Sequence, residues 1–210
     1  MEIITIETGP IPTNGYLLID KKNKKGLIID TPMDSANLFL TNINEQDIQI
    51  DGILLTHSHW DHTADSHLLS NLTNAPVFIH ANDEYRLVNP NKNTIWDLPY
   101  TLEPHKPEKY LENKQLISCG EILLEVRYVP GHTEGSVCFY EKNEKVIFTG
   151  DTLFNSSIGR TDLPGGSFEL LINSINTQIL NLSDEILIYP GHGHSSSVGN
   201  ERRYNPFINQ

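Results

Sequence analysis

Residues 57–62 read His57-Ser58-His59-Trp60-Asp61-His62 and follow the apolar run at residues 53–55 after a single threonine, Thr56. His57 and His59 lie two positions apart, so on an extended segment both imidazoles point to the same side. Asp61 and His62 come where a helical pattern begins, and the turn there can aim them beside the first pair. Among 9 histidines in the chain, this spacing arises by chance on the order of once in a thousand such sequences. We therefore interpret the stretch as a set of metal ligands.

Further ligand candidates appear where other apolar runs end. Pro130-Gly131-His132, Thr149-Gly150-Asp151 and Pro190-Gly191-His192 each follow such a run. Glycine permits the tight turn that brings its neighbour's side chain over the edge of a sheet. Imidazole and carboxylate groups suit zinc, and also iron or manganese. Seven ligands are too many for one tetrahedral ion, whereas two ions that share one carboxylate use them all. The sequence therefore predicts a binuclear site for two divalent metal ions, with zinc as the first expectation.

Short runs rich in β-branched residues alternate with segments of helical pattern. The runs predict strands at residues 3–6, 16–19, 27–29, 53–55, 77–79, 122–129, 137–140, 146–148 and 186–189. Helices are predicted at residues 34–41, 61–72, 82–88 and 168–180, the last behind an N-cap at Ser167. Four prolines within residues 89–116 predict an irregular segment. The fold class is therefore α/β.

One internal repeat connects the two halves of the chain. Residues 15–31 and 135–152 each contain an apolar strand, a polar turn, a second apolar strand and an Asp-Thr pair. Hairpins are common and resemble one another, so two short matches do not prove duplication. The other interpretation is that two similar sheet-containing halves face each other.

The charge of the chain limits its partners. The 210 residues include 15 Lys+Arg and 27 Asp+Glu, a formal net charge of −12, which argues against binding to nucleic acid or to an anionic membrane surface. Two cysteines make no disulfide framework, and no apolar run approaches the roughly 20 residues that span a bilayer. We therefore expect a cytoplasmic protein with a small-molecule substrate. The sequence does not indicate an oligomeric state.

Together these motifs resemble the metallo-β-lactamase-fold hydrolases of the glyoxalase II (hydroxyacylglutathione hydrolase) type. The resemblance covers HSHWDH, PGHTEGS, FTGDTLF and YPGHG, and GRTDLPGG at residues 159–166 is similar to the short bacterial branch. The family implies a single domain over residues 1–210, folded as a four-layer αββα sandwich with the metals at one edge between the sheets. It also implies the ligands: His57, His59 and His132 on the first metal, Asp61, His62 and His192 on the second, and Asp151 between them. Asp61 and Asp151 are thereby the carboxylates expected to act in catalysis.

The resemblance and metal chemistry together imply hydrolysis of a thioester of a small thiol, with S-lactoylglutathione as the first candidate. Hydroxide held between the two metals would attack the carbonyl carbon, and a thiolate leaves without being protonated. The main alternative is an iron oxidoreductase similar to the persulfide dioxygenases, which share the fold but use a single iron. They resemble Pro-Ala-His-Asp where this chain has Pro190-Gly191-His192-Gly193, and this difference favours the hydrolase. A β-lactamase is less favoured because Asp151 belongs to the glyoxalase II pattern. A non-catalytic metal-binding module stays open, although closed structural zinc sites are usually rich in cysteine.

Substrate contacts are expected from residues outside the ligand set. The longer glyoxalase II enzymes carry a C-terminal helical domain that helps to grip glutathione, whereas this chain ends at Gln210. We therefore expect substrate contacts from Arg160, Arg202, Trp96 and Tyr100. Asp30 is expected either to orient a metal ligand, as the family suggests, or only to end a strand. Structural or solvated roles are expected for His67, His80, His105, His194, Cys119 and Cys138.

Overall fold

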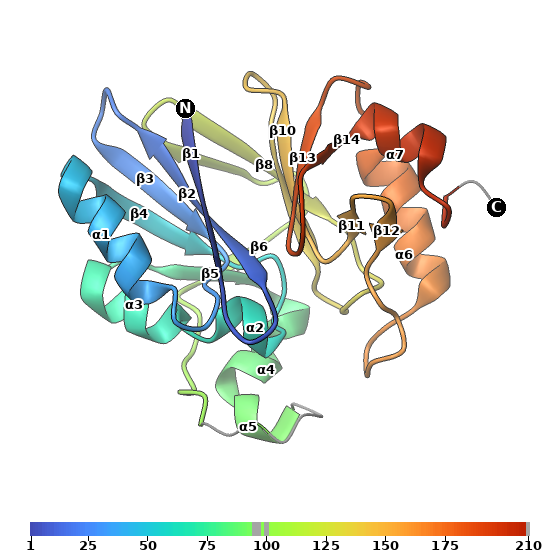
Figure 1. Ribbon diagram of the computed structural model, residues 1–210. Coiled ribbons are helices and arrows are strands. Elements are labelled where there is room, and N and C mark those ends of the chain that lie inside the picture. The colour runs from blue at the N-terminus through green and yellow to red at the C-terminus, as the bar shows by residue number, and fades with distance from the viewer. Residues whose placement is uncertain (94–97, 99–100, 209–210) are drawn as a thin grey trace.

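Two six-stranded sheets form the centre of the molecule (Figure 1). The computed structural model describes residues 1–93, 98 and 101–208. Within that part, the first sheet has the order β1 (Glu2–Thr8), β2 (Thr13–Asp20), β3 (Lys25–Ile29), β4 (Gln49–Leu54), β5 (Val77–His80) and β6 (Lys109–Leu111). The second has the order β14 (Ser196–Ser197), β13 (Leu187–Pro190), β10 (Val146–Gly150), β9 (Val137–Glu141), β8 (Ile122–Tyr128) and β7 (Leu116–Cys119). A small hairpin pairs β11 (Leu153–Phe154) with β12 (Ser157–Ile158).

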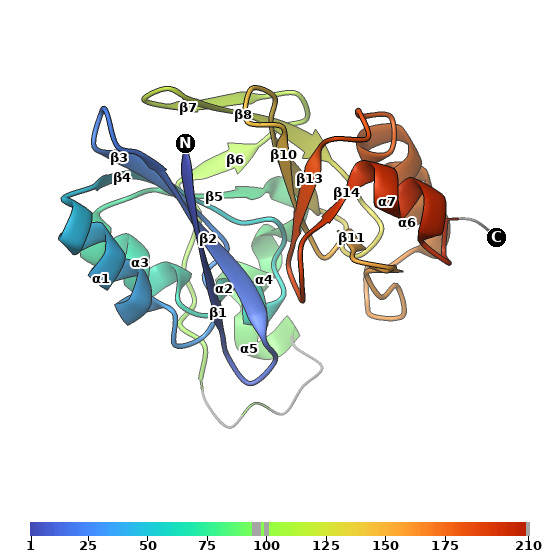
Figure 2. The same cartoon turned by 45° about the horizontal axis from the view of Figure 1, so that its top comes forward.

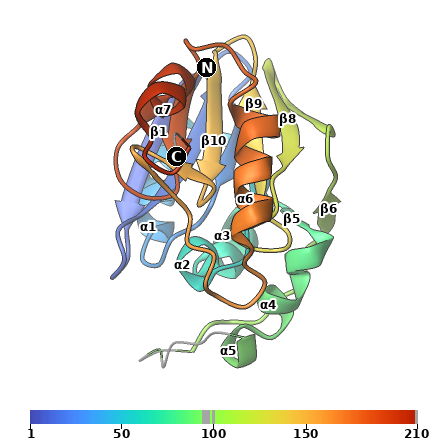
Figure 3. The same cartoon turned by 90° about the vertical axis from the view of Figure 1, so that its right-hand side faces the viewer.

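Helices cover the outer face of each sheet. The first sheet carries α1 (Ala36–Gln46) and α3 (Ser66–Thr73), and the second carries α6 (Phe168–Ser174), the π-helical turn η2 (Ile175–Ile179) and α7 (Val198–Tyr204) (Figures 1 and 3). The short elements α2 (Trp60–Thr63), η1 (Ala81–Asp83), α4 (Glu84–Val88) and α5 (Pro90–Asn93) complete the described set. The predicted cap is present, because Ser167 accepts a hydrogen bond from the Leu170 N–H. The α/β class and the four-layer αββα sandwich are confirmed.

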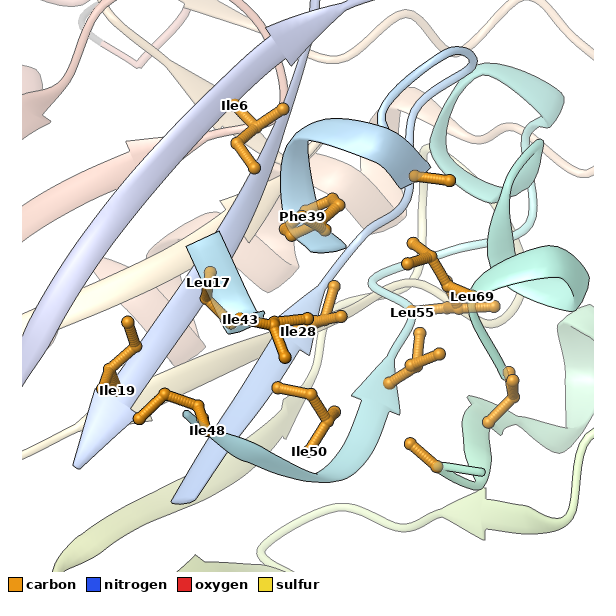
Figure 4. Packing of buried hydrophobic residues seen from close by; sticks show 14 of the residues in the cluster. Ile6, Leu17, Ile19, Ile28, Phe39, Ile43, Ile48, Ile50, Leu55 and Leu69 are labelled. Carbon is orange, nitrogen blue, oxygen red and sulfur yellow. The ribbon is translucent and has the colours of Figure 1, made fainter. Parts of the chain in front are cut away.

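Among the described residues, three apolar cores hold the four layers together. In β2, Leu17 and Ile19 pack towards the helices, whereas Tyr16 and Leu18 face the second sheet, as the two-residue period of a strand requires. Figure 4 shows the helix-side core, in which Phe39 of α1 is fully buried. A second core fills the space between the sheets, and a third lies beneath α6 and α7. Both faces of each sheet are therefore buried, which explains the apolar runs of the central strands.

The internal repeat corresponds to two similar hairpins in different sheets. The β2–β3 hairpin turns at Lys24 and the β9–β10 hairpin at Lys145, both with left-handed backbone angles of φ 52° and 58°. In each case the second strand of the hairpin then pairs in parallel with another strand, β4 or β13. Figure 2 shows the two sheets as distinct layers. The structure thus supports the interpretation that two sheet-containing halves face each other.

The proline-rich segment is more regular than the sequence predicts. It contains α5, the strand β6 and the start of β7. β6 begins after Pro107 and pairs in parallel with β5, from Phe78 opposite Lys109 to His80 opposite Leu111, so a partner strand imposes the order that local sequence lacks. Trp96 and Tyr100 lie outside the described residues. Within the described part, no helix is long and apolar enough to cross a membrane.

Strand direction brings four loops to one edge of the molecule. β10 runs parallel to β13, and β9 runs antiparallel to both β10 and β8, so β8, β10 and β13 all end at the same side. β3 and β4 likewise run parallel in the first sheet. At this edge the sheets are joined by two hydrogen bonds of 2.8 Å, from Val137 N–H to Thr56 O and from Asn14 N–H to Gly191 O. The loops after β4, β8, β10 and β13 therefore meet.

Candidate metal centre

Five imidazoles and two carboxylates converge where these loops meet. Their ligand atoms form three overlapping groups, within each of which the atoms lie no more than 4.8 Å apart. The groups are His57, His59 and His132; His57, His62 and Asp151; and Asp61, His62 and His192. All seven predicted ligand residues are thus brought together.

The first group combines the strand-end pair with the loop after β8. His132 Nε2 lies 2.8 Å from His59 Nδ1, and His132 Nδ1 donates to Arg160 O at 2.8 Å. The rings of His57 and His132 are 4.8 Å apart, close to perpendicular. The backbone acceptor assigns the proton of His132 to Nδ1, which leaves Nε2 free to bind a cation.

The group of Asp61, His62 and His192 is formed by α2 and the loop after β13. His192 Nε2 lies 3.3 Å from both Asp61 Oδ2 and His62 Nε2. His192 Nδ1 donates to Pro12 O at 2.7 Å, and Thr13 Oγ1 donates to Asp61 Oδ2 at 3.3 Å. The first residue of β2 and the residue before it therefore hold two members of this group in place.

Asp151 lies between the group of His57, His59 and His132 and the group of Asp61, His62 and His192. Its Oδ1 is 3.2 Å from His62 Nε2, and its Oδ2 is 3.5 Å from His132 Nε2 and 3.4 Å from His192 Nε2. The carboxylate therefore contacts members of both groups, which is the position that a shared ligand requires.

Asp30 supports the histidines from behind. Its Oδ2 accepts a 2.8 Å hydrogen bond from His62 Nδ1 and a 2.7 Å hydrogen bond from Thr56 Oγ1, which itself lies 3.1 Å from His57 Nδ1. The Thr56 N–H donates to Oδ1 at 2.8 Å. Asp30 is 1% exposed and fixes one histidine directly and another through Thr56. Of the two roles expected for Asp30, the contacts match the orienting one.

Burial and the neighbouring charges shift the pKa values of several groups in the cluster. Burial lowers the pKa of His59 to about 3, so this imidazole is neutral. Burial also lowers the pKa of His192, but the neighbouring carboxylates of Asp151 and Asp61 outweigh it and raise that pKa to about 10. For Asp151, burial favours the protonated form, yet the charges of His62 and His192 bring its pKa well below the usual range. The cluster thus attracts positive charge.

The donor set fits two cations. His57 Nε2 is buried and makes no hydrogen bond within the described part of the chain. Asp151 Oδ1 likewise makes no hydrogen bond there, although it lies 3.2 Å from His62 Nε2. A buried polar atom without a partner costs roughly 1–3 kcal/mol, and a cation is the partner that neutral imidazole and carboxylate share. The residues would hold one ion at His57, His59 and His132 and another at Asp61, His62 and His192, with Asp151 between them.

Two glycines allow the backbone to pass close to the groups of the cluster. Gly150 has φ +49°, and a Cβ there would lie 2.4 Å from Thr56 Oγ1. A Cβ on Gly191 would lie 2.2 Å from Asp151 Oδ1. Both distances are far below contact distance, so any other side chain would displace the groups that support or form the cluster.

A cavity of about 340 Å³ opens above the cluster. His59, Asp61, His132, Asp151 and His192 form part of its lining. The rest is largely apolar and comprises Ile11, Ser58, Trp60, Thr63, Arg86, Pro90, Leu102, Phe154, Ile158, Arg160, Leu163 and Pro164. Of the expected substrate contacts, Arg160 lines this cavity. Arg86 also lines the cavity. The sequence did not predict this contact, because a single arginine in a helical segment belongs to no recognisable motif.

Arg202 does not lie where a substrate contact was expected. Its guanidinium donates to the carbonyl oxygens of Leu180 and Leu182, each at 2.6 Å, and pairs with Asp184. It does not line the cavity. Arg202 ties α7 to the end of η2, and we withdraw it as a substrate contact. The other two expected contacts, Trp96 and Tyr100, lie outside the described residues.

The remaining histidines and both cysteines lie outside the metal-ligand groups. His67 contacts Asn71, His105 contacts Ser66, and His80 stacks on Tyr128. His194 is exposed. Cys119 and Cys138 are free and buried.

Known proteins share this sequence pattern. Residues 8–192 match the family described as the metallo-beta-lactamase superfamily. Hydroxyacylglutathione hydrolase GloC of Haemophilus influenzae is 35% identical over 212 residues, which cover 100% of this chain and 99% of that protein.

Solved structures share the fold. The BLEG-1 B3 metallo-beta-lactamase has 33% identity and a TM-score of 0.92, with 100% of both chains covered. TTHA1623 in a di-iron-bound form has 31% identity and a TM-score of 0.86, covering 97% of this chain and 99% of that one. ETHE1 from Myxococcus xanthus has 25% identity and a TM-score of 0.82, covering 98% and 84%. This chain belongs to the metallo-beta-lactamase superfamily.

Proposed function

We propose that the chain is a binuclear metallohydrolase that cleaves a thioester of a small thiol, with S-lactoylglutathione as the first candidate substrate. The observation that carries the proposal is the position of Asp151, within 3.5 Å of histidines from both ligand groups. When bound, two divalent ions would supply a hydroxide nucleophile near neutral pH and polarise the carbonyl oxygen. The similarity to GloC over the whole chain supports a thioester substrate.

The histidines are arranged to act without reorganisation. His132, His192 and His62 each have an oxygen acceptor at Nδ1: Arg160 O, Pro12 O and Asp30 Oδ2. These acceptors hold the ring orientation and direct the Nε2 atoms into the cluster. The ligand geometry is therefore set before substrate arrives.

Arg160 is the residue we propose to hold an anionic end of the substrate. Its Nε and Nη2 donate to the two carboxylate oxygens of Asp162, each at 2.8 Å, and both side chains are about half exposed or more. Solvent screens an exposed pair of this kind, so it contributes little to stability. A substrate carboxylate can thus replace Asp162 at little cost.

The first test measures free thiol released from S-lactoylglutathione by protein of known metal content. We expect close to two ions per chain, and Asp151→Ala is expected to lose at least one ion and most of the activity. A single tightly bound iron in fully active protein would contradict the binuclear assignment.

The same preparation separates the alternatives. Oxygen uptake with glutathione persulfide tests the iron oxidoreductase similar to persulfide dioxygenases. A β-lactam substrate is included because BLEG-1 is similar over its whole length. Oxygen consumption or β-lactam cleavage without thiol release would overturn the thioesterase proposal.

A further inference from the structure

Asp83 is a buried carboxylate that the reaction scheme above does not use. It ends η1, directly after β5, and is 0% exposed. Asp83 Oδ2 accepts from the Ser58 N–H at 2.9 Å and from Thr133 Oγ1 at 2.8 Å. Its Oδ1 accepts from the Gly135 N–H at 2.8 Å and lies 3.5 Å from Arg86 Nη1.

These partners belong to the two segments that carry one ligand group. Ser58 lies between His57 and His59, and Thr133 directly follows His132. One carboxylate therefore joins the loop after β4, in the first sheet, to the loop after β8, in the second. It adds to the backbone hydrogen bond from Val137 N–H to Thr56 O, which joins the same two segments close to the ligands.

We propose that Asp83 is a positioning residue for the ion held by His57, His59 and His132. The proposal rests on the metal centre proposed above. Asp83 acts through the Ser58 backbone and the Thr133 side chain rather than by touching the ion. Asp30 plays the corresponding part for His62.

The carboxylate form is required because both oxygens accept hydrogen bonds. An amide in its place would turn an N–H donor towards either the Ser58 N–H or the Gly135 N–H, since one of these faces each oxygen. Two facing donors push the loops apart, and a buried donor without an acceptor is costly. Gly135 also marks the tightness of the contact, because a Cβ there would lie 2.7 Å from Asp83 Oδ1.

Asp20 offers a matched control for Asp83→Asn. Asp20 is 6% exposed, and it accepts hydrogen bonds from the Lys22 N–H and the Glu121 N–H, which also belong to two different loops. It ends β2, whose other end at Thr13 contacts Asp61. Seven steps along a strand separate these positions by roughly 23 Å. Asp20→Asn is therefore the same chemical change, made far from the ligands.

The experiment loads wild type, Asp83→Asn and Asp20→Asn with Zn²⁺ and measures affinity by competition with a chelator. Circular dichroism first checks that each variant is folded. We expect Asp83→Asn to bind one of its two ions about 10-fold to 100-fold more weakly, as loss of a group that supports metal ligands typically does, and Asp20→Asn to retain both. Loading with Co²⁺ should then show a changed absorption spectrum for one site in Asp83→Asn alone. If Asp83→Asn does not fold, Thr133→Val removes one donor to Asp83 with little change in shape, and the same weakening is expected.

Wild-type affinity at both sites in folded Asp83→Asn would overturn the proposal. Equal weakening in Asp20→Asn would also overturn it, because the effect would then be one of general stability. A different result would reject the proposed function. Wild type that binds two ions but releases no thiol from any thioester would reject the thioesterase and leave the Asp83 result standing.

Discussion

Asp30→Asn tests how far the metal centre depends on its support. The left-handed backbone at Asp30, φ 55°, is one that asparagine tolerates, so the substitution changes hydrogen bonding without straining the chain. In the less costly orientation, the new amide faces the Thr56 N–H and leaves that donor unpaired. The bonds from Thr56 Oγ1 and His62 Nδ1 keep an acceptor but lose its charge.

The expected cost follows from these three bonds. An unpaired buried donor costs about 1–3 kcal/mol, and a bond to a neutral acceptor is roughly half as strong as one to a carboxylate. We therefore expect the free energy of unfolding of the metal-free protein to fall by about 2–4 kcal/mol. The affinity for metal should fall about 10-fold to 100-fold, because His57 and His62 lose their fixed orientation.

The assay combines urea denaturation of the metal-free protein with chelator competition for Zn²⁺. Asp34→Asn is the control, because Asp34 is exposed and has a similar backbone angle of φ 64°. Surface changes of this kind usually alter stability by less than about 0.5 kcal/mol. A loss for Asp30→Asn no larger than that of the control, with unchanged Zn²⁺ affinity, would refute the role assigned to Asp30.

Three further predictions concern other parts of the chain. His192→Ala should abolish turnover and lower the metal content. His67→Ala should change neither, since His67 contacts Asn71 and His105 and lies outside the ligand groups. Equal loss in both variants would indicate that the histidines act through folding. Burial raises the pKa of Cys119 and of Cys138 to about 12. Both thiols should therefore resist a thiol reagent at pH 8 in the native protein and react on unfolding, and their contribution to stability should be lost as the pH rises from about 8.5 towards 12. Phe39→Ala empties a fully buried site beneath α1 and should cost about 3–5 kcal/mol in urea denaturation; a cost below about 1 kcal/mol would mean that the core collapses around the gap.

Several features of the protein follow from the sequence because they depend on neighbours along the chain. The spacing of His57 and His59 needs only an extended backbone, and glycine beside Asp151 and His192 needs only a tight turn. Two-residue alternation and apolar runs likewise indicated most central strands. These patterns were enough to predict the α/β class and the ligand cluster, whereas the four-layer sandwich was expected from the resemblance of the motifs to a known family.

Other features depend on which segments pack together, and no local pattern contains that information. β6 is ordered by its parallel partner β5, and Arg202 is turned to the η2 end by carbonyls about twenty residues away in the chain. Asp83 and Arg86 follow β5, which brings them to the centre. The partners of Asp83, Ser58 and Thr133, lie 25 and 50 residues from it in the chain. Sequence thus determined which groups could bind metal, whereas only the tertiary structure decided which groups hold them in place, because such contacts form between residues that the chain brings together only on folding.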